Sequence, residues 1–183
     1  MSKRTEIIRL AIEYIKMYSF PELSYDYIAK KLNISKAAIH YYFKNKKDLG
    51  IAVCDYFEEN LRQQLSDFLE NPEKSAWEFI HERTRDFNSD EICPIVSIQS
   101  DLNQYDEDLR LKIIELVNLE YDVYVKILSR KLDNKTSAKY AQIHLSALKG
   151  AQLYSRTISK PFFITVLNYI ENEINELNKG EPI

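Results

Sequence analysis

The chain has 183 residues, of which 45% are hydrophobic and 29% charged, a composition that excludes a largely disordered protein. With 3 glycines and 5 prolines it contains few helix breakers, which favours an all-helical fold. No apolar run approaches the ~20 residues of a membrane span, and residues 1–6 lack the apolar core of a signal peptide, so we expect a cytoplasmic protein.

The net charge of −3 is unevenly distributed along the chain. Residues 1–50 contain ten Lys or Arg and five acidic residues, a balance of +5, whereas the remaining residues contain 15 basic and 23 acidic groups, a balance of −8. A small basic head on an acidic body indicates that the head meets a polyanion and the body does not.

Four helices are predicted in the first 70 residues. Apolar residues at helical spacing predict the first over residues 3–18. Ser24 and Ser35 are good N-caps for two short helices over residues 25–32 and 36–43. Asn45 opens a fourth helix that continues to about residue 69, so a continuous helix joins the head to the body. The remaining helices are predicted over residues 73–87, 94–103, 107–132, 136–158 and 162–177.

Residues 24–43 meet the requirements of a helix-turn-helix. Ala29 is the small residue needed where the two helices cross, and Asn33 tolerates the left-handed backbone of the corner. The other reading is a helical hairpin inside an ordinary bundle. The polar and aromatic outer face of the second helix argues against it, because that face has no core to fill. This face carries Lys36, His40, Tyr41 and Tyr42.

These residues carry a family resemblance. The opening Arg4-x-x-Ile7-Ile8-x-x-Ala11 and the run from Ile34 to Leu49 resemble the DNA-binding domain of the TetR family of bacterial helix-turn-helix transcriptional regulators. The resemblance covers about residues 4–55, and Ser19 and Asn33 depart from it by standing where the family usually has Gly. It implies a three-helix DNA-binding domain over residues 1–48, joined by a long helix to a helical effector-binding and dimerisation domain over residues 49–183.

The resemblance implies that the recognition helix faces the major groove with Ser35, Lys36, Ala37, His40 and Tyr41, and that Tyr42 and Lys46 hold phosphates. Physical chemistry gives the same division, because Lys36 can reach guanine or a phosphate, His40 can present ring nitrogens to base edges and Ala37 can pack on a thymine methyl. Tyr25, after the Ser24 cap, is a further phosphate contact. The predicted DNA-binding residues are Ser24, Tyr25, Ser35, Lys36, Ala37, His40, Tyr41, Tyr42 and Lys46.

A recognition helix of about two turns reads few base pairs, so affinity requires two heads. We therefore expect a homodimer on a pseudo-palindromic double-stranded DNA operator. The family resemblance implies control by a small molecule, and we expect a repressor. The last two helices are the predicted dimer surface, although both of their apolar faces can also lie inside one subunit. The predicted interface residues are Leu145, Leu148, Gly150, Phe163, Leu167, Ile170 and Ile174.

The family also implies an effector pocket in the body. Residues that can line it with a few polar groups are Trp77, His81, Cys93, Gln99, Tyr121, Tyr124, His144 and Tyr154. We expect no cofactor, metal or enzymatic activity, since no zinc spacing, Gly-rich phosphate loop or nucleophile motif occurs. Cys54 and Cys93 are then buried thiols, with a scattered Cys-His metal sensor as the other reading.

Three alternative functions stay open from the sequence. The first is a small-molecule sensor or enzyme with a vestigial head, which turnover or a failure to bind DNA would reveal. The second is an architectural protein whose DNA binding no metabolite perturbs, and the third is an activator. For a ligand-controlled regulator, the unbroken helix over residues 45–69 indicates that ligand binding changes the angle of that helix and so the spacing of the two heads.

Overall fold

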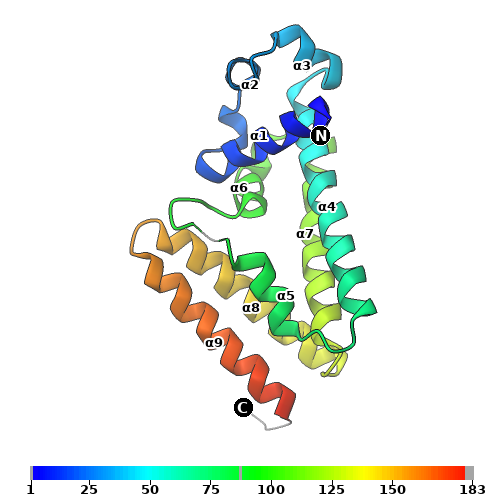
Figure 1. The fold of residues 1–183 in the computed structure, drawn as a ribbon, viewed down its shortest axis with the longest axis vertical. Coiled ribbons are helices and arrows are strands. Elements are labelled where there is room, and N and C mark those ends of the chain that lie inside the picture. Colours follow the sequence, from blue (N-terminus) through cyan, green and yellow to red (C-terminus); the bar gives the residue numbers. More distant parts are fainter. Residues whose placement is uncertain (1, 87, 180–183) are drawn as a thin grey trace. The chain divides into compact units, whose positions relative to one another are not determined.

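A computed structural model describes residues 2–86 and 88–179 of the chain (Figure 1). Within these residues it has nine α-helices, two 3₁₀-helices and no strand, which confirms the all-α prediction. None of the helices described is both long enough and apolar enough to cross a bilayer. The chain forms two compact units, a first unit of Met1–Glu58 with Ile92–Val117 and a second unit of Glu59–Glu91 with Asn118–Ile183.

The first unit is built around α1 (Lys3–Met17), which packs against α2 (Tyr25–Leu32) and α6 (Pro94–Ser100) (Figure 1). The amphipathic pattern of α1 explains this position, because its apolar residues recur at helical spacing and are buried. They are Ile7, Ile8, Ala11, Ile12 and Ile15. The unit also contains η1 (Phe20–Glu22), α3 (Lys36–Tyr42), η2 (Leu102–Gln104) and the first parts of α4 (Lys46–Glu70) and α7 (Glu107–Leu128).

The helix-turn-helix forms where it is predicted. Ser24 and Ser35 accept hydrogen bonds from the amides of Tyr27 and Ala38, so each caps its helix as expected. Between the helices Asn33 adopts the left-handed conformation, with φ 50° and ψ 49°. The prediction that Asn33 supplies the left-handed corner is confirmed.

The second unit contains the remainder of α4 and α7 together with α5 (Ala76–Thr84), α8 (Asn134–Ser155) and α9 (Lys160–Lys179). Figure 1 shows α8 and α9 as an antiparallel hairpin, and the two pack along their length. Their facing rows of apolar residues form much of the unit's core. The buried residues of these rows are Tyr140, Ala141, Leu148, Ala151, Phe163, Leu167, Ile170 and Ile174.

Several helix boundaries differ from the prediction, and the starts of α5 and α8 differ for a local reason. α5 begins three residues later because Ser75 and Glu78 form a capping box, and it ends at Thr84. The predicted end of this helix, Phe87, lies outside the described residues. α7 ends at Leu128 rather than residue 132. α8 begins at Asn134 because the Asp133 carboxylate accepts hydrogen bonds from the amides of Lys135 and Thr136.

The compact units do not divide the chain at residue 48. The first unit includes α6 and the start of α7, which are held to the N-terminal helices by specific bonds. Ser97 Oγ of α6 donates to the Tyr18 carbonyl at 3.1 Å, and Lys47 Nζ of α4 donates to the Asp108 carboxylate of α7 at 2.7 Å. This packing does not test the functional division into residues 1–48 and 49–183, which stays a prediction.

The two helical glycines make a matched pair for testing the packing of the first unit. A Cβ on Gly50 of α4 would lie 2.9 Å from both Leu109 Cδ2 and Phe20 Cζ, whose side chains are buried, whereas a Cβ on Gly150 of α8 meets nothing within 4 Å. Both Gly→Ala changes gain the same helix propensity, and Gly50→Ala alone overfills a core. We expect Gly50→Ala to be less stable than Gly150→Ala by about 1–3 kcal/mol in urea unfolding. Equal stability of the two variants would contradict the close packing at Gly50.

Candidate nucleic-acid interface and ligand site

The outer face of α3 is exposed, and it carries every residue predicted to face the major groove. Ser35, Lys36, Ala37, His40 and Tyr41 are all exposed, with Tyr41 at 83%. On the opposite side of the helix Ile39 and, just beyond it, Phe43 are buried. The amphipathic pattern therefore turns the hydrogen-bonding side chains outward as one surface.

Two of these side chains are held in place by neighbours. Lys36 Nζ lies 2.9 Å from the Asp26 carboxylate at the start of α2. His40 Nδ1 lies 3.1 Å from the backbone carbonyl of Lys44, and the His40 ring packs edge-on against Tyr25. Because a carbonyl oxygen can only accept, Nδ1 is the donor in this contact, and in the uncharged ring Nε2 is then an acceptor.

Tyr25 occupies a different place from the one predicted. Its side chain is 8% exposed, and its hydroxyl donates to the Asn45 carbonyl at 2.6 Å and lies 3.1 Å from the Phe43 carbonyl oxygen. Burial raises the pKa of this phenol to about 12. Tyr25 therefore braces the end of α3 from within the fold, and its hydroxyl is already occupied where a phosphate contact was expected.

The predicted phosphate contacts at the α3–α4 corner are unequal in exposure. Tyr42 is 38% exposed. Lys46 is half-buried, its ammonium donates to the Pro21 carbonyl at 2.5 Å, and burial lowers its pKa. Further exposed lysines in this unit were not among the predicted contacts. Lys30, Lys31 and Lys44 contribute to the basic count of the head but fall outside the motif positions.

In the second unit His144 is the centre of a buried hydrogen-bonded chain. Its side chain is fully buried, and Nε2 lies 2.5 Å from a carboxylate oxygen of Glu173. Since that carboxylate accepts the Nε2 proton, Nδ1 accepts from the Tyr124 hydroxyl at 3.3 Å. The Tyr169 hydroxyl donates to the other oxygen of Glu173 at 3.3 Å.

A second buried polar cluster joins α5, α7 and α8. Arg83 and Lys149 both approach one carboxylate oxygen of Glu120, each at 2.8 Å, and Arg83 also donates to Gln64 Oε1 on α4 at 2.8 Å. Burial raises the pKa of Glu120, but the two facing cations outweigh it and hold the pKa below its usual value. Glu120 is therefore an ionised carboxylate in the interior, at a position where burying a charge is costly unless it is paired.

The structure brings together only some of the predicted effector residues. Tyr124 and His144 are bonded in the buried chain, and Trp77 and His81 have ring centroids 5.6 Å apart on α5. Tyr121 is half-buried, and Tyr154 is exposed and stacks on Phe162. Cys93 and Gln99 belong to the first unit. Arg83, Glu120 and Lys149 were missed, because a sequence does not show which charged positions on separate helices meet.

Most of the predicted dimer residues lie in the core of the second unit. Five of the seven are at most 8% exposed: Leu148, Phe163, Leu167, Ile170 and Ile174. Leu145 and Gly150 are half-buried. The exposed large apolar residues of α8, α9 and their connection are instead Ile143, Leu153, Tyr154, Ile158, Phe162, Ile164 and Tyr169. α8 and α9 do carry two apolar faces each. Most of the residues predicted for the dimer interface belong to the face that is buried inside the second unit.

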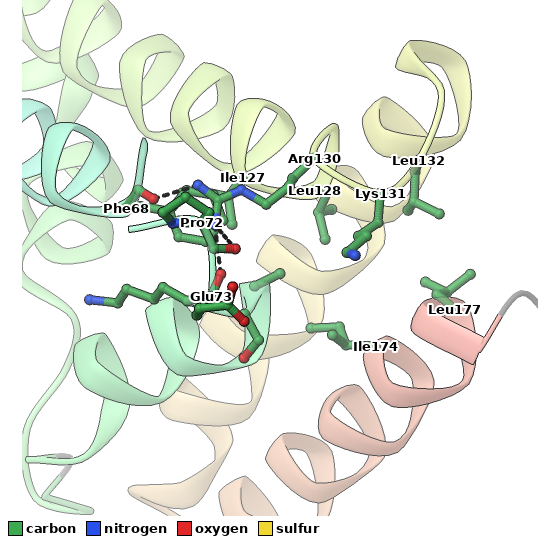
Figure 2. Close-up of a pocket in the computed structure, with 13 residues that line it drawn as sticks. Phe68, Pro72, Glu73, Ile127, Leu128, Arg130, Lys131, Leu132, Ile174 and Leu177 are labelled. Atoms are coloured by element: carbon green, nitrogen blue, oxygen red, sulfur yellow. Dashed lines mark hydrogen bonds between the residues drawn. The ribbon is translucent and has the colours of Figure 1, made fainter. Parts of the chain in front are cut away.

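One cavity of the second unit lies apart from the predicted effector residues. It has a volume of about 150 Å³ and opens where α4 and α7 end and α5 begins (Figure 2). None of the eight predicted effector residues lines it. In the part of the chain that the structure describes, no group of three or more His, Cys, Asp or Glu side chains is placed to hold a metal ion.

Comparisons with known proteins give a family model that matches the N-terminal residues and solved structures with a similar fold over most of the chain. Residues 7–53 match the model of bacterial regulatory proteins of the tetR family. A TetR transcriptional regulator from Legionella pneumophila superposes with a TM-score of 0.85 at 24% identity, over 94% of this chain and 97% of that one. A TetR-family regulator from Agrobacterium tumefaciens gives 0.79 at 18% identity, over 93% and 96%.

FadR from Bacillus subtilis, solved in complex with stearoyl-CoA, gives a TM-score of 0.63 at 20% identity, over 98% of this chain and 100% of that one. At these identities the structural similarities show the fold alone. No curated protein matches the chain.

The buried His144 gives the second unit a testable pH dependence. Burial lowers the pKa of His144, although Glu173 opposes the shift, so the native state resists protonation. The unfolded state takes up that proton near pH 6.5, so the free energy of unfolding falls as the pH drops below that value, by at most ~1.4 kcal/mol per pH unit. We expect His144→Gln to flatten the profile of urea unfolding between pH 7 and pH 5. The control is His81→Gln, an exposed histidine. Parallel profiles for wild type and His144→Gln would show that His144 is not the group responsible.

Proposed function

We propose, from the premise that this chain belongs to the tetR family of bacterial regulatory proteins through its N-terminal domain, that it is a cytoplasmic, ligand-responsive repressor. It binds a pseudo-palindromic operator as a homodimer. The observation that carries the DNA-binding part is the outer face of α3, on which Lys36, His40 and Tyr41 are exposed to solvent. The left-handed corner at Asn33 sets the direction of this helix.

The geometry of His40 supports a specific role in reading sequence. With Nδ1 protonated and bonded to the Lys44 carbonyl, the neutral imidazole offers Nε2 as an acceptor. In the major groove the exocyclic amines of adenine and cytosine are donors, whereas guanine presents O6 and N7 as acceptors. We therefore assign His40 to an amine, N6 of adenine or N4 of cytosine, at one position of each half-site.

The DNA-binding proposal is tested by selecting bound sequences from a random duplex library at a stated salt concentration. An enriched inverted repeat supports a dimeric regulator, because two short recognition helices related by two-fold symmetry require two half-sites. The matched control is the variant Lys36→Ala, which keeps the fold because its side chain is exposed. Equal recovery of all sequences by the folded wild-type protein would overturn the proposal in favour of a vestigial head.

The role of His40 is tested on the selected site by removing one amine from the DNA. Replacing the assigned adenine or cytosine by an analogue without its exocyclic amine is expected to weaken wild-type binding by about 1 kcal/mol, roughly fivefold. The same analogue should leave the affinity of His40→Ala unchanged, since the partner atom is already missing. Fluorescence anisotropy with both proteins and both duplexes measures this coupling. An analogue penalty of equal size in the two proteins would contradict the assignment.

The buried polar groups of the second unit support a ligand-responsive role. Arg83, Glu120 and Lys149 meet between three helices of this unit. On the same side of α8 as Lys149, one turn further on, the buried Oε1 of Gln152 has no hydrogen-bond partner among the described residues. Because a buried acceptor is normally satisfied, we infer that the effector is a small molecule with a hydrogen-bond donor.

Communication between ligand and DNA is proposed to run through α4. This helix begins at Lys46, beside the recognition helix in sequence, and is unbroken to Glu70. An effector that prefers one orientation of α4 changes the spacing of the two heads, and by linkage it weakens DNA binding only as far as it prefers that orientation. Spin labels on the two recognition helices measure the spacing, and an unchanged distance at saturating effector would contradict this mechanism.

The exposed apolar face of α8 and α9 supports the homodimer. On α8, Ile143, Ala147, Gly150 and Tyr154 recur at helical spacing, and Ile143 and Tyr154 are 45% and 56% exposed. Tyr154 stacks on Phe162, which continues the face onto α9. Around Gly150 there is open space, with no atom of this chain within 4 Å of an added Cβ. Exposed apolar faces of this kind are typical of a self-complementary contact between two copies.

Repression is proposed because a dimer bound across an operator excludes other proteins from that DNA and needs no additional contact. A reporter gene placed behind the selected operator decides the sign of regulation. Higher expression in the presence of the protein would replace repression by activation and leave the DNA-binding proposal intact.

The dimer face is tested by placing a charge on it. Ile143→Glu is expected to raise the dissociation constant of the dimer at least about 30-fold, since a buried carboxylate would face its symmetry mate. Leu111→Glu on α7 is the control, because Leu111 is 50% exposed and carries a similar apolar side chain. Sedimentation equilibrium measures both, and circular dichroism checks that each variant is folded. A dimer as tight in Ile143→Glu as in Leu111→Glu would rule out this face.

A further inference from the structure

Eight of the thirteen side chains that line the cavity at the end of the second unit are apolar. Phe68 comes from the last turn of α4, Pro72 and Ala76 from the connection to α5 and the start of that helix, and the others from α7, the turn after it and α9 (Figure 2). Its apolar lining consists chiefly of Phe68, Ile127, Leu128, Leu132, Ile174 and Leu177. A dry cavity of ~150 Å³ with Leu, Ile and Phe walls is large enough for a benzene ring, and this one also measures about 150 Å³.

The rim of the cavity carries excess positive charge. Arg130 is fixed there, because its guanidinium donates to the carbonyls of Phe68, Asn71 and Lys74 and lies 3.6 Å from the centroid of the Phe68 ring. Lys74 is paired with Glu82 at 2.7 Å. Among the lining residues Glu73, whose carboxylate is exposed, is acidic, whereas Lys74, Arg130 and Lys131 are basic.

Lys131 is the cation of this rim that is available to a ligand. It follows Arg130 in the turn between α7 and α8, and its side chain is exposed. Its ammonium makes no ion pair or hydrogen bond with any residue that the structure describes. Figure 2 shows Lys131 extending into the cavity, toward the side where Ile174 lies. An ammonium over an apolar floor is an arrangement that favours an amphiphilic anion.

We propose that this cavity is a second small-molecule site, which binds a compact carboxylic acid with an aromatic or branched aliphatic body. The apolar body lies against Phe68, Leu128 and Ile174, and the carboxylate pairs with Lys131. The size of the cavity limits the body to roughly one aromatic ring. A cationic ligand is disfavoured by the excess positive charge of the rim. The site is independent of the effector region around Glu120 and does not require that the protein bind DNA.

Benzoate and its neutral analogue benzyl alcohol are the probes for this site. The full-length protein is titrated with each, and methyl NMR signals of Ile127, Leu128, Ile174 and Leu177 report on the cavity. We expect saturable shifts of these methyls with benzoate, and binding at least about tenfold weaker for benzyl alcohol, because the alcohol lacks the charge-assisted bond to Lys131. Absence of saturation by benzoate at these methyls, or equal affinity for the two probes, would overturn the proposal.

Variants separate the charge from the cavity. Lys131→Ala is expected to weaken benzoate binding about tenfold while leaving benzyl alcohol unaffected. Lys135→Ala, an exposed lysine on α8 outside the lining, is the control and should bind benzoate as wild type does. Leu132→Trp fills the cavity at a half-buried position and should abolish binding of both probes. Benzoate binding that survives Leu132→Trp in a folded protein would locate the ligand elsewhere and contradict the assignment.

Discussion

The left-handed backbone at Asn33 is the constraint on which the proposed DNA-reading surface depends. At φ 50° this residue ends α2, and the Ile34 amide closes the turn on the Ala29 carbonyl at 3.1 Å. Ser35 then starts α3 at once by capping it. Since three successive residues stop one helix and start the next, the direction of α3 is set locally. With this direction, the apolar side of α3 faces the core of the first unit. Lys36 and His40, on the opposite side, stay exposed to solvent.

The far end of α3 is fixed by a different device. The Tyr25 hydroxyl, buried in the unit, bonds the carbonyls of Phe43 and Asn45 where α3 gives way to α4. A buried carbonyl without a donor costs free energy, so this hydroxyl stabilises the corner that carries α4 away from the recognition helix. His40 packs on the same ring and bonds Lys44 within the corner. The side chain that we propose to read a base is thus oriented by the same residue that stabilises the corner.

Sequence reasoning recovered what is set by local chemistry. The caps Ser24 and Ser35, the left-handed Asn33 and the unbroken α4 each depend on a few adjacent residues, and each was predicted. The starts of α5 and α8 differ from the prediction by two or three residues, because the caps at Ser75 and Asp133 set them and apolar periodicity does not. The place of the Tyr25 hydroxyl could not be predicted in this way, because its partner, the Phe43 carbonyl, lies 18 positions further along the chain.

What the sequence could not decide is which of two equivalent faces a helix buries. α8 carries two apolar rows, and periodicity alone treats them alike. In the structure Leu148 and its row fill the protomer's own core, while Ile143 and Tyr154 stay exposed. The choice follows from the polar side chains carried with each row. The row of Leu148 also brings His144 inward, where Glu173 of α9 satisfies it at 2.5 Å. The opposite pairing would expose the imidazole and leave the buried Glu173 carboxylate with the Tyr169 hydroxyl but without His144, and burying a carboxylate that has lost a hydrogen-bond partner costs free energy.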